Sequence, residues 1–569
     1  MYSNYILSED YGDFLLSNTP DSSLDDLLAA TNIPFMQVNR LFKVSWFPLN
    51  RLPNNLLSMA LYSSIPKLYI PQSTAALDNA GILQVQERPA LGVTGNGVII
   101  GIIDSGINYT HPAFRRSDGS SRIMFLWDQT IQPEDYPGAA GTAPSLFPYG
   151  MIYSQADIDR ALASEDPFSI VPSRDDTGHG TAVAGVAAGS PDSNANFSGV
   201  APEASLVVVK LKPAKQYLIR QACLSPSIPV YEETDIMCAI SWMEDISFRR
   251  KMPLSLCLSC QSWQGAHNGD SALEQTVRLL STLPGLTLTT GTGDEADKAH
   301  HAFGEFRNNR EDSVELLVPE NASAFSAEIW CPPVALLSAG IQAPSGDRVA
   351  NIPARLGTQE SLQFLLDRTT VEINYEIIRG EGGNQMIYLR FLTPSPGIWR
   401  LNLTASGTSD SFFHLWLPAY GTLDKDVRLL RPDPFTTIMG PGNCIHCFTV
   451  AVNNTANTAT EGFSGRGYNF LDLVTPSIAA PGSNLTAPSY IEGYQSFTGA
   501  SACTALTTGC CALVLEWARS LTPPKNYGQN EIRTFLLRGA DRPSGESFPN
   551  PFSGYGNLNL EQSFLSFFA

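Results

Sequence analysis

The apolar run at residues 97–103, Gly-Val-Ile-Ile-Gly-Ile-Ile, constrains the fold more than any other stretch of this chain. Its β-branched residues follow one another without polar alternation, which is typical of a strand buried on both faces of a parallel sheet. Similar runs at 205–211, 254–259 and 286–290 alternate with helix-like segments such as 234–248. This alternation predicts a doubly wound α/β sheet.

Length and composition describe a large folded protein with an acidic surface. At 569 residues the chain exceeds one ordinary hydrophobic core, which predicts roughly two to four domains. Hydrophobic residues make up 43% and charged residues 16%, the balance of a folded chain. The net charge of −19 argues against nucleic acid or an anionic membrane as a partner.

No segment of the sequence predicts secretion or a membrane span. Acidic Glu9 and Asp10 stand where a signal peptide would be most hydrophobic. The longest apolar run, 502–515, contains threonines and is shorter than the roughly 20 residues that cross a bilayer. We therefore expect a cytoplasmic protein.

The cysteines are unevenly placed and too few for a disulfide framework in so long a chain. We interpret them as buried, reduced thiols. Cys257 with Cys260 and Cys444 with Cys447 have the spacing of a four-thiolate zinc site. The first pair lies in an extended run, where residues three apart point to opposite faces, so we predict no metal site.

Residues 1–76 form the first predicted unit. The expected elements are, in order, a strand at 5–9, a helix at 22–30, strands at 33–39 and 41–47, a helix at 52–62 and a strand at 66–71. This β-α-β-β-α-β order is that of a ferredoxin-like module. The residues at 72–76, Gln-Ser-Thr-Ala-Ala, have the composition of a linker.

Between residues 307 and 418 the pattern changes from alternating helices and strands to strands alone. Short alternating runs are separated by Gly, Pro, Ser and Asn at 314–318, 326–331, 362–366, 371–378, 385–392, 397–403 and 411–417. We interpret this block as an inserted β-sandwich or jelly roll. Residues 77–306 and 419–569 then form the α/β domain.

Three residues stand where a catalytic site would be expected. Asp104 ends the strand at 97–103, at the sheet edge where open α/β proteins bind ligands, although an aspartate before Ser-Gly is also an ordinary turn. His179 lies between two glycines, a setting more typical of catalysis than of a core. Ser501 lies among small residues before an apolar helix, a pattern that fits a nucleophile or close helix packing.

Taken together, these motifs resemble those of the subtilisin-like serine proteases. The motifs are Asp104-Ser105-Gly106, Gly178-His179-Gly180-Thr181 and Gly499-Ala500-Ser501-Ala502. Their order along the chain, Asp, His, Ser, differs from that of other serine hydrolase classes. The resemblance implies a subtilisin-like doubly wound sheet and a serine endopeptidase, with Ser501 as nucleophile, His179 as general base and Asp104 as the residue that orients the histidine.

Further segments resemble the Csp-type germination proteases of clostridia and their gut-bacterial relatives. They lie at 122–129, 264–269, 297–301 and 433–438. Those proteins have a prodomain, a subtilase domain and a jelly-roll insertion. The resemblance implies that residues 1–76 are an inhibitory and chaperoning prodomain, removed by self-cleavage near Gln72-Ser73. It also implies limited proteolysis of a specific target protein and a cytoplasmic or spore-associated location.

Departures from the family pattern fall at the oxyanion hole and at the substrate-binding edge. Ser501 and Asp294 take the oxyanion-hole positions, but an ionised aspartate accepts hydrogen bonds where the usual asparagine donates one. A protonated Asp294 would still donate. The substrate-binding positions are taken by Ser259, Cys260, Gln261 and Gly291. Gln261 replaces a glycine, which we expect to narrow the primary specificity pocket.

Two other functions are open at this point. One is a weakly active or non-catalytic regulator, since Csp-type relatives include members that lack triad residues. The intact Asp104, His179 and Ser501 favour the enzyme, whereas Asp294 and Gln261 favour weak or specialised activity. Ligand binding by the inserted domain, for instance of carbohydrate, has no convergent polar cluster in its favour. No cofactor is expected; calcium is common in relatives, but no loop here has enough clustered acids to assign ligands. The expected partners are the chain's own prodomain, retained or released, and a protein or peptide substrate.

Overall fold

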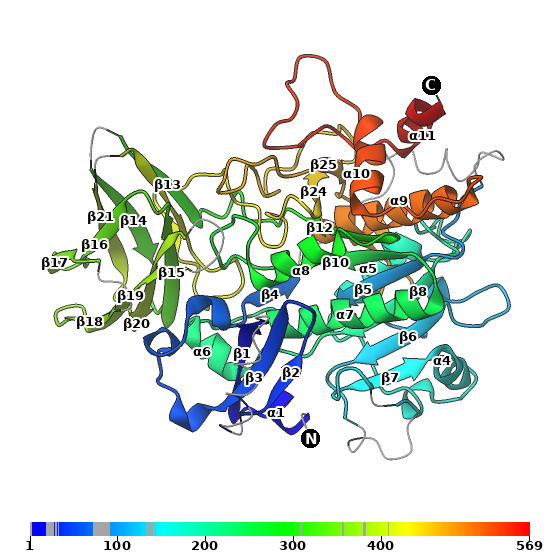
Figure 1. Cartoon of the computed structure of the whole chain (residues 1–569), viewed down its shortest axis with the longest axis horizontal. Coiled ribbons are helices and arrows are strands. Elements are labelled where there is room, and N and C mark those ends of the chain that lie inside the picture. Colours follow the sequence, from blue (N-terminus) through cyan, green and yellow to red (C-terminus); the bar gives the residue numbers. More distant parts are fainter. Residues whose placement is uncertain are drawn as a thin grey trace.

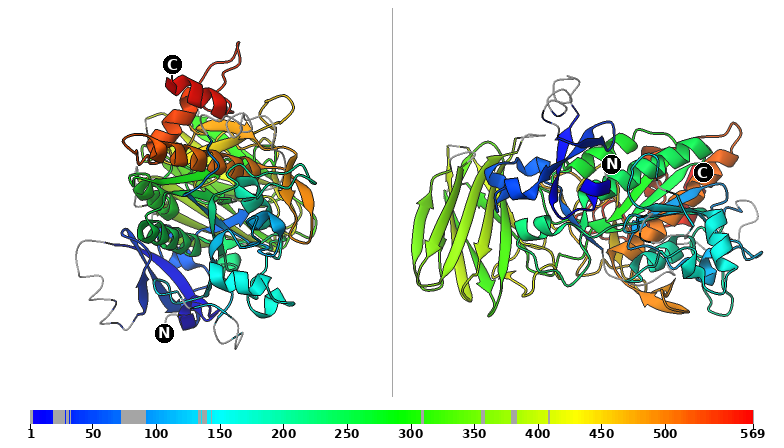
Figure 2. Two further views of the ribbon diagram at one scale, coloured as in Figure 1. Left: turned by 90° about the vertical axis from the view of Figure 1, so that its right-hand side faces the viewer. Right: turned by 90° about the horizontal axis from the view of Figure 1, so that it is seen from below.

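The computed structural model describes three packed parts of the chain. The described residues are 3–18, 28, 31, 33–71, 92–132, 135, 140–142, 144–307, 310–354, 358–378, 383–407 and 409–568. An eight-stranded sheet with helices on both faces forms one part, and two antiparallel sheets form another beside it (Figure 1). The N-terminal segment packs against both of them, as Figure 2 shows from two other sides.

The main sheet has the strand order β25-β24-β12-β10-β5-β8-β6-β7. Its strands are β5 (Ile99–Asp104), β6 (Ile123–Asp128), β7 (Met151–Ser154), β8 (Ser205–Lys210), β10 (Leu254–Leu258), β12 (Leu286–Gly291), β24 (Phe448–Asn453) and β25 (Ile478–Pro481). Neighbouring strands are parallel except at the edge, where β7 pairs antiparallel with β6. The predicted α/β fold with a largely parallel sheet is therefore confirmed.

Helices cover both faces of this sheet. One face packs against α5 (His179–Ala188) and α9 (Ala500–Ser520), and the other against α7 (Glu233–Arg250) and α8 (Ala272–Leu280). β5 contributes alternate residues to the two cores, as its uninterrupted β-branched run predicts. Helix α9 is long and apolar enough to cross a membrane, but 94% of its apolar window is buried inside the protein.

The remaining helices lie at the periphery of the main sheet. They are α4 (Gln155–Leu162), α6 (Gln216–Gln221), α10 (Gln529–Arg538) and α11 (Leu560–Phe568). A hairpin of β26 (Leu485–Pro488) and β27 (Tyr494–Phe497) leads directly into α9. The hairpin therefore fixes where α9 begins, and Ser501 lies at that N-terminus.

Two antiparallel sheets enclose a separate apolar core between residues 301 and 429. The first contains β13 (His301–Phe306), β22 (Ser411–Trp416), β15 (Ala324–Cys331), β20 (Gln385–Leu392), β19 (Thr369–Ile377) and β18 (Thr358–Phe364). The second contains β17 (Arg348–Ile352), β16 (Leu336–Gln342), β21 (Gly397–Ser406), β14 (Glu311–Val318) and β23 (Arg428–Leu429). The first sheet begins at His301, ahead of the expected boundary at 307. A jelly-roll connection and the domain boundaries stay predictions.

The N-terminal elements differ from those predicted. A helix, α1 (Ser3–Ile6), replaces the expected strand at 5–9, and the sheet is formed by β1 (Tyr11–Ser17), β3 (Phe42–Pro48) and β2 (Phe35–Gln37) in that order. Short 3₁₀ turns replace the expected helix at 52–62: η1 (Leu49–Arg51), η2 (Leu56–Ser58) and η3 (Tyr62–Ser64).

Asn55 explains why no α-helix forms between residues 52 and 62. Its Oδ1 accepts a hydrogen bond from the Leu57 N–H at 3.1 Å, and its Nδ2 donates to Asn374 Oδ1 at 2.9 Å. These local and tertiary hydrogen bonds replace those of a continuous helix. Nearly all of the expected helix at 22–30 lies outside the described residues.

The last expected N-terminal strand forms, but it does not join the N-terminal sheet. Instead β4 (Leu68–Pro71) lies between β9 (Tyr231–Glu232) and β11 (Cys260–Gln261) of the α/β part and is antiparallel to both. Its Leu68 and Tyr69 are fully buried. An extended segment added between two strands in this way has the geometry of a bound peptide.

Candidate active site

The structure brings together the three side chains that the sequence motifs singled out. The Nδ1 of His179 lies 2.8 Å from Oδ1 and 2.9 Å from Oδ2 of Asp104, and its Nε2 lies 2.9 Å from Ser501 Oγ. A carboxylate only accepts hydrogen bonds, so in a neutral imidazole Nδ1 carries the proton and Nε2 is the acceptor for the serine hydroxyl.

Asp104 sits at the carboxyl end of β5 and is fully buried. Its carboxylate accepts hydrogen bonds from the Ser105 N–H at 2.6 Å and from the Ser259 hydroxyl, in addition to His179. Burial alone would raise the pKa of Asp104, but the charge on His179 and these hydrogen bonds outweigh it and hold the pKa below its usual value. The group is therefore poised as a carboxylate beside the imidazole.

Asp175 organises the two loops that carry the acid and the histidine, and the sequence analysis missed it. Its Oδ1 accepts from Ser105 Oγ at 2.8 Å and from the Gly178 N–H at 2.9 Å. Its Oδ2 accepts from the N–H and the hydroxyl of Thr181 at 2.8 and 2.6 Å. The available signal was an acid four residues before His179, at the start of the loop.

Close backbone packing explains the glycine after His179. A Cβ on Gly180 would lie 2.2 Å from the carbonyl oxygen of Gly106, so only glycine lets α5 begin against the loop that follows β5. Gly178 caps the same helix with φ +82°, a conformation that side chains disfavour. The Gly-His-Gly motif therefore sets the distance between α5 and β5.

Ser501 lies at the N-terminus of α9, one residue after the start of the helix. The preceding Gly499 has φ +130°, which allows a sharp entry from β27 into the helix. No described residue accepts a hydrogen bond from the Ser501 N–H. This donor, together with the positive end of the helix dipole, favours negative charge beside the hydroxyl.

Asp294 follows β12 and lies next to the first turn of α9, which carries Ser501. Its Oδ1 accepts a hydrogen bond from the Ala500 N–H at 3.3 Å. In this arrangement the carboxylate is an acceptor directed at the first turn of α9. Asp294 thus contacts the residue before Ser501, and its carboxylate accepts a hydrogen bond there rather than donating one.

The four residues expected at the substrate-binding edge lie on two segments joined by a hydrogen bond, residues 259–261 and the end of β12 at Gly291. The Ser259 carbonyl is 3.4 Å from Ser501 Oγ, and Cys260 with Gln261 forms β11, which pairs with β4. The Gln261 side chain is fully buried and its amide donates to the Gly291 carbonyl. Gln261 therefore bridges β11 and the end of β12.

No metal centre is found in the part of the chain that the structure describes, where no group of three or more His, Cys, Asp or Glu is placed to hold an ion. All ten cysteines are buried and none forms a disulfide. Cys257 belongs to the core beneath α9, whereas Cys260 belongs to the core beneath α7. Cys257 lies on β10 and Cys260 on β11, which belong to different sheets, so the two thiols lie in different apolar cores.

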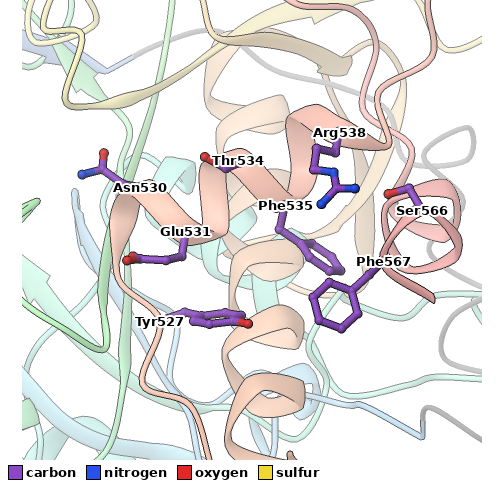
Figure 3. A pocket seen from close by; sticks show the side chains of 8 residues that line it. All are labelled: Tyr527, Asn530, Glu531, Thr534, Phe535, Arg538, Ser566 and Phe567. Atoms are coloured by element: carbon purple, nitrogen blue, oxygen red, sulfur yellow. The ribbon is translucent and has the colours of Figure 1, made fainter. Parts of the chain in front are cut away.

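A cavity of about 370 Å³ lies between α10 and α11, away from these residues. Figure 3 shows Phe535 and Phe567 facing one another beside Tyr527, with the polar ends of Glu531 and Arg538 at its rim. None of the candidate catalytic or substrate-binding residues lines this cavity.

Comparison with known proteins connects the site to one family. The model of the subtilase family matches residues 95–267 and 431–557, which together make up more than half of the chain. The solved CspB protease of Clostridium perfringens is similar, with a TM-score of 0.74 and 27% identity over 85% of this chain and 97% of that one.

Two curated proteases are similar over shorter stretches. Subtilisin-like protease SBT2.2 of Arabidopsis thaliana is 36% identical over 138 residues, 20% of this chain and 15% of that protein. Serine protease AprX of Bacillus subtilis is 35% identical over 147 residues, 22% of this chain and 31% of that protein. The chain therefore spans less than a third of the length of these curated relatives.

Proposed function

Because the chain belongs to the subtilase family, we propose that it is a serine endopeptidase with Asp104, His179 and Ser501 as its catalytic triad. The observation that carries this proposal is the hydrogen-bonded order of carboxylate, imidazole and hydroxyl, with 2.8 and 2.9 Å between successive polar atoms. A serine hydroxyl needs such an adjacent base to attack a peptide carbonyl.

The proposed reaction follows from the position of each group. Ser501 Oγ forms a bond to the carbonyl carbon while His179 Nε2 takes the hydroxyl proton. The C–N bond then breaks and the imidazolium gives that proton to the leaving amine, which leaves an acyl-enzyme. Water repeats the sequence and releases the acid. The Ser501 N–H would stabilise the oxyanion, and Asp104 the imidazolium.

We also propose that the chain cuts itself after Gln72. β4 occupies the groove between β9 and β11, and Pro71 pairs with Cys260. The described part of β4 thus ends opposite the residue that follows Ser259, whose carbonyl is 3.4 Å from Ser501 Oγ. Gln72 and Ser73 themselves lie outside the described residues.

The N-terminal segment has the contacts of a prodomain that stays bound after such a cut. The Asp13 carboxylate forms a buried ion pair of 2.7 Å with Lys215 of the α/β part, and the Tyr62 hydroxyl donates to Glu328 of β15 at 2.7 Å. These buried contacts do not depend on the bond after residue 72. We therefore propose that the N-terminal segment stays bound after the cut and acts as an inhibitor. It would restrict access to the groove, so that only selected protein targets are cleaved.

Two measurements on the purified chain test the proposed activity. N-terminal sequencing should find a new terminus at Ser73. After the N-terminal segment is removed, a fluorophosphonate probe should label Ser501, and chain unfolded in urea should stay unlabelled. A folded chain that is neither cut nor labelled would favour the second candidate function, a non-catalytic regulator. The hydrogen bond that Asp294 accepts from the Ala500 N–H supports this second function.

Replacing Asp294 by asparagine is expected to increase the rate of fluorophosphonate labelling about a hundredfold at pH 7. The amide supplies the side-chain donor that a carboxylate lacks, and one oxyanion-hole donor changes turnover by about a hundredfold to a thousandfold. Asp294→Ala removes the charge without adding a donor and serves as the control. Equal rates for the asparagine and alanine variants would show that the donor has no role.

A further inference from the structure

A cavity of about 300 Å³ lies where the three parts of the chain meet. The N-terminal segment contributes Phe42, Tyr62 and Lys67 to its wall, and β15 of the antiparallel sheets contributes Trp330. The α/β part contributes Glu274 of α8 and the loop before this helix. A cavity of this size, with aromatic walls and a few polar groups, can hold a small organic molecule.

The ammonium group of Lys67 lies in this wall without a carboxylate in contact. The side chain is buried, with 7% of its surface exposed, and its Nζ lies 4.1 Å from the centre of the Tyr62 ring. Among the described residues no carboxylate forms an ion pair with it. A buried cation without an opposite charge is costly, and the face of one tyrosine offsets only part of that cost.

The carboxylate of Glu274 lies in the same wall, and no described Lys, Arg or His forms an ion pair with it. Its Oε2 accepts a hydrogen bond from the Ser271 N–H at 2.8 Å. Its Oε1 lies beside Gly440, another residue of the wall, where an added Cβ would be 3.5 Å from it. Burial raises the pKa of Glu274 to about 7, because hydrogen bonds from Ser271 do not offset the loss of water.

The other acidic side chains of the described wall have closer partners. The two oxygens of Glu233 accept hydrogen bonds from the N–H groups of Lys67 and Leu273, at 3.1 and 2.9 Å. Asp270 forms an ion pair of 3.1 Å with Arg278. Both oxygens of Glu233 are thus engaged, whereas only one oxygen of Glu274 accepts from a backbone N–H.

Lys67 and Glu274 act on each other across the cavity without touching. The charge of Lys67 lowers the pKa of Glu274, although no ion pair joins them. A carboxylate beside Lys67 and an ammonium group beside Glu274 would each form a charge-assisted hydrogen bond. The rings of Trp330, Tyr62 and Phe42 supply apolar surface in the same wall.

We propose that this cavity binds a free amino acid with an apolar side chain. Its carboxylate pairs with Lys67, its ammonium group pairs with Glu274, and its side chain packs against Trp330 and Tyr62. A molecule with only one of these charges leaves the other charge of the wall unpaired. Because Lys67 belongs to the N-terminal segment, the bound amino acid also strengthens the attachment of that segment.

Calorimetric titration of the full-length Ser501→Ala chain tests the proposal, because its N-terminal segment stays joined whether or not the wild type cuts itself. At about pH 8 Glu274 is ionised. The probes are phenylalanine and leucine, each compared with the acid that lacks its ammonium group, hydrocinnamate or isocaproate, and with the amine that lacks its carboxylate, phenethylamine or isoamylamine. At least one amino acid should bind, and its acid and its amine should bind about 10- to 100-fold more weakly.

Substitutions of the two charges assign each contact. Lys67→Met should weaken binding of the amino acid about 10- to 100-fold, and the amino acid and its amine should then bind within about threefold of each other. Glu274→Gln should make the amino acid and its acid equivalent in the same way. Lys298→Met is the matched control, because Lys298 also lies over a tyrosine ring, that of Tyr420, but does not line the cavity.

Three results would overturn the proposal: no binding of either amino acid to the folded chain, equal binding of amino acid, acid and amine, or unchanged binding in both variants. Thermal unfolding without ligand shows whether each variant folds. If Lys67→Met does not fold, Glu274→Gln and the comparison of probes in the parent chain still decide. None of these titrations depends on proteolytic activity, so failure of the proposed endopeptidase would leave them unchanged.

Discussion

The Ser501→Ala chain is expected to keep its full length under conditions in which the wild-type chain is cut into residues 1–72 and 73–569. Without the hydroxyl, His179 has no nucleophile to activate, and removal of a triad serine lowers turnover by about a millionfold. The substitution removes one oxygen from a helix whose other contacts remain, so the fold should persist. Intact mass and N-terminal sequencing of both chains measure the cut.

Ser520 offers a matched control for this experiment. It lies at the other end of the same helix, where its hydroxyl donates to the Trp517 carbonyl at 2.8 Å. Ser520→Ala should be cut like the wild-type chain. A cut after residue 72 in purified Ser501→Ala would mean that another protease or another nucleophile makes it, and the proposed self-cleavage would be wrong.

The α/β part could be predicted from the sequence because its signals are local. A strand buried on both faces needs β-branched residues without alternation, and β5 has them. The glycines around His179 and the small residues around Ser501 are required by backbone approach within a few residues of each motif. The order of the three motifs along the chain, Asp, His, Ser, then indicated the arrangement of the subtilisin-like proteases.

The N-terminal part could not be predicted in the same way, because its structure depends on distant partners. The sequence of β4 predicts a strand, but only the folded chain shows that this strand pairs with β9 and β11 rather than with β1. Asn55 is bound by residues more than three hundred positions away, which no local pattern reveals. The same holds for Gln261, whose residue type indicated a narrow pocket but not the hydrogen bond from its amide to the Gly291 carbonyl.

His301 and His414, to which the sequence assigned no role, form a buried pair on β13 and β22. Nδ1 of His301 lies 2.9 Å from the Asp433 carbonyl, and its Nε2 lies 2.9 Å from Nδ1 of His414. The carbonyl requires a proton on His301 Nδ1, so in the neutral pair His414 Nδ1 donates to His301 Nε2. Protonation of both rings would set two N–H groups against each other.

Burial reinforces this geometry. It lowers the pKa of His301 to about 3 and holds the pKa of His414 well below its usual value, where the charge of His301 adds to the effect. The folded values lie below the unfolded value of about 6.5. The contribution of the pair to the unfolding free energy is therefore complete above pH 6.5 and is lost as the pH falls below it. The reason is that the two histidines bind protons in the unfolded chain but not in the folded one.

A chain with His301→Gln and His414→Gln is accordingly expected to resist acid better than the wild type. Between pH 7 and pH 5 the wild type should lose about 2 kcal/mol more of its unfolding free energy because of His301, and His414 adds to this loss. Buried acids such as Glu274 and Glu376, with pKa values raised to about 7 by burial, act in the opposite direction in both chains and cancel. Urea unfolding at the two pH values measures the difference.

His300 supplies a control of opposite sign. Burial alone would lower its pKa, but Glu295 at 2.7 Å and Asp426 at 2.8 Å outweigh it and raise the pKa to about 9. Its stabilisation is complete below pH 6.5 and is lost as the pH rises through 9, so His300→Gln should enlarge the loss between pH 7 and pH 5 by about 1 kcal/mol. If the His301 and His414 variant loses as much stability as the wild type over this range, the pair is not held neutral in the folded chain.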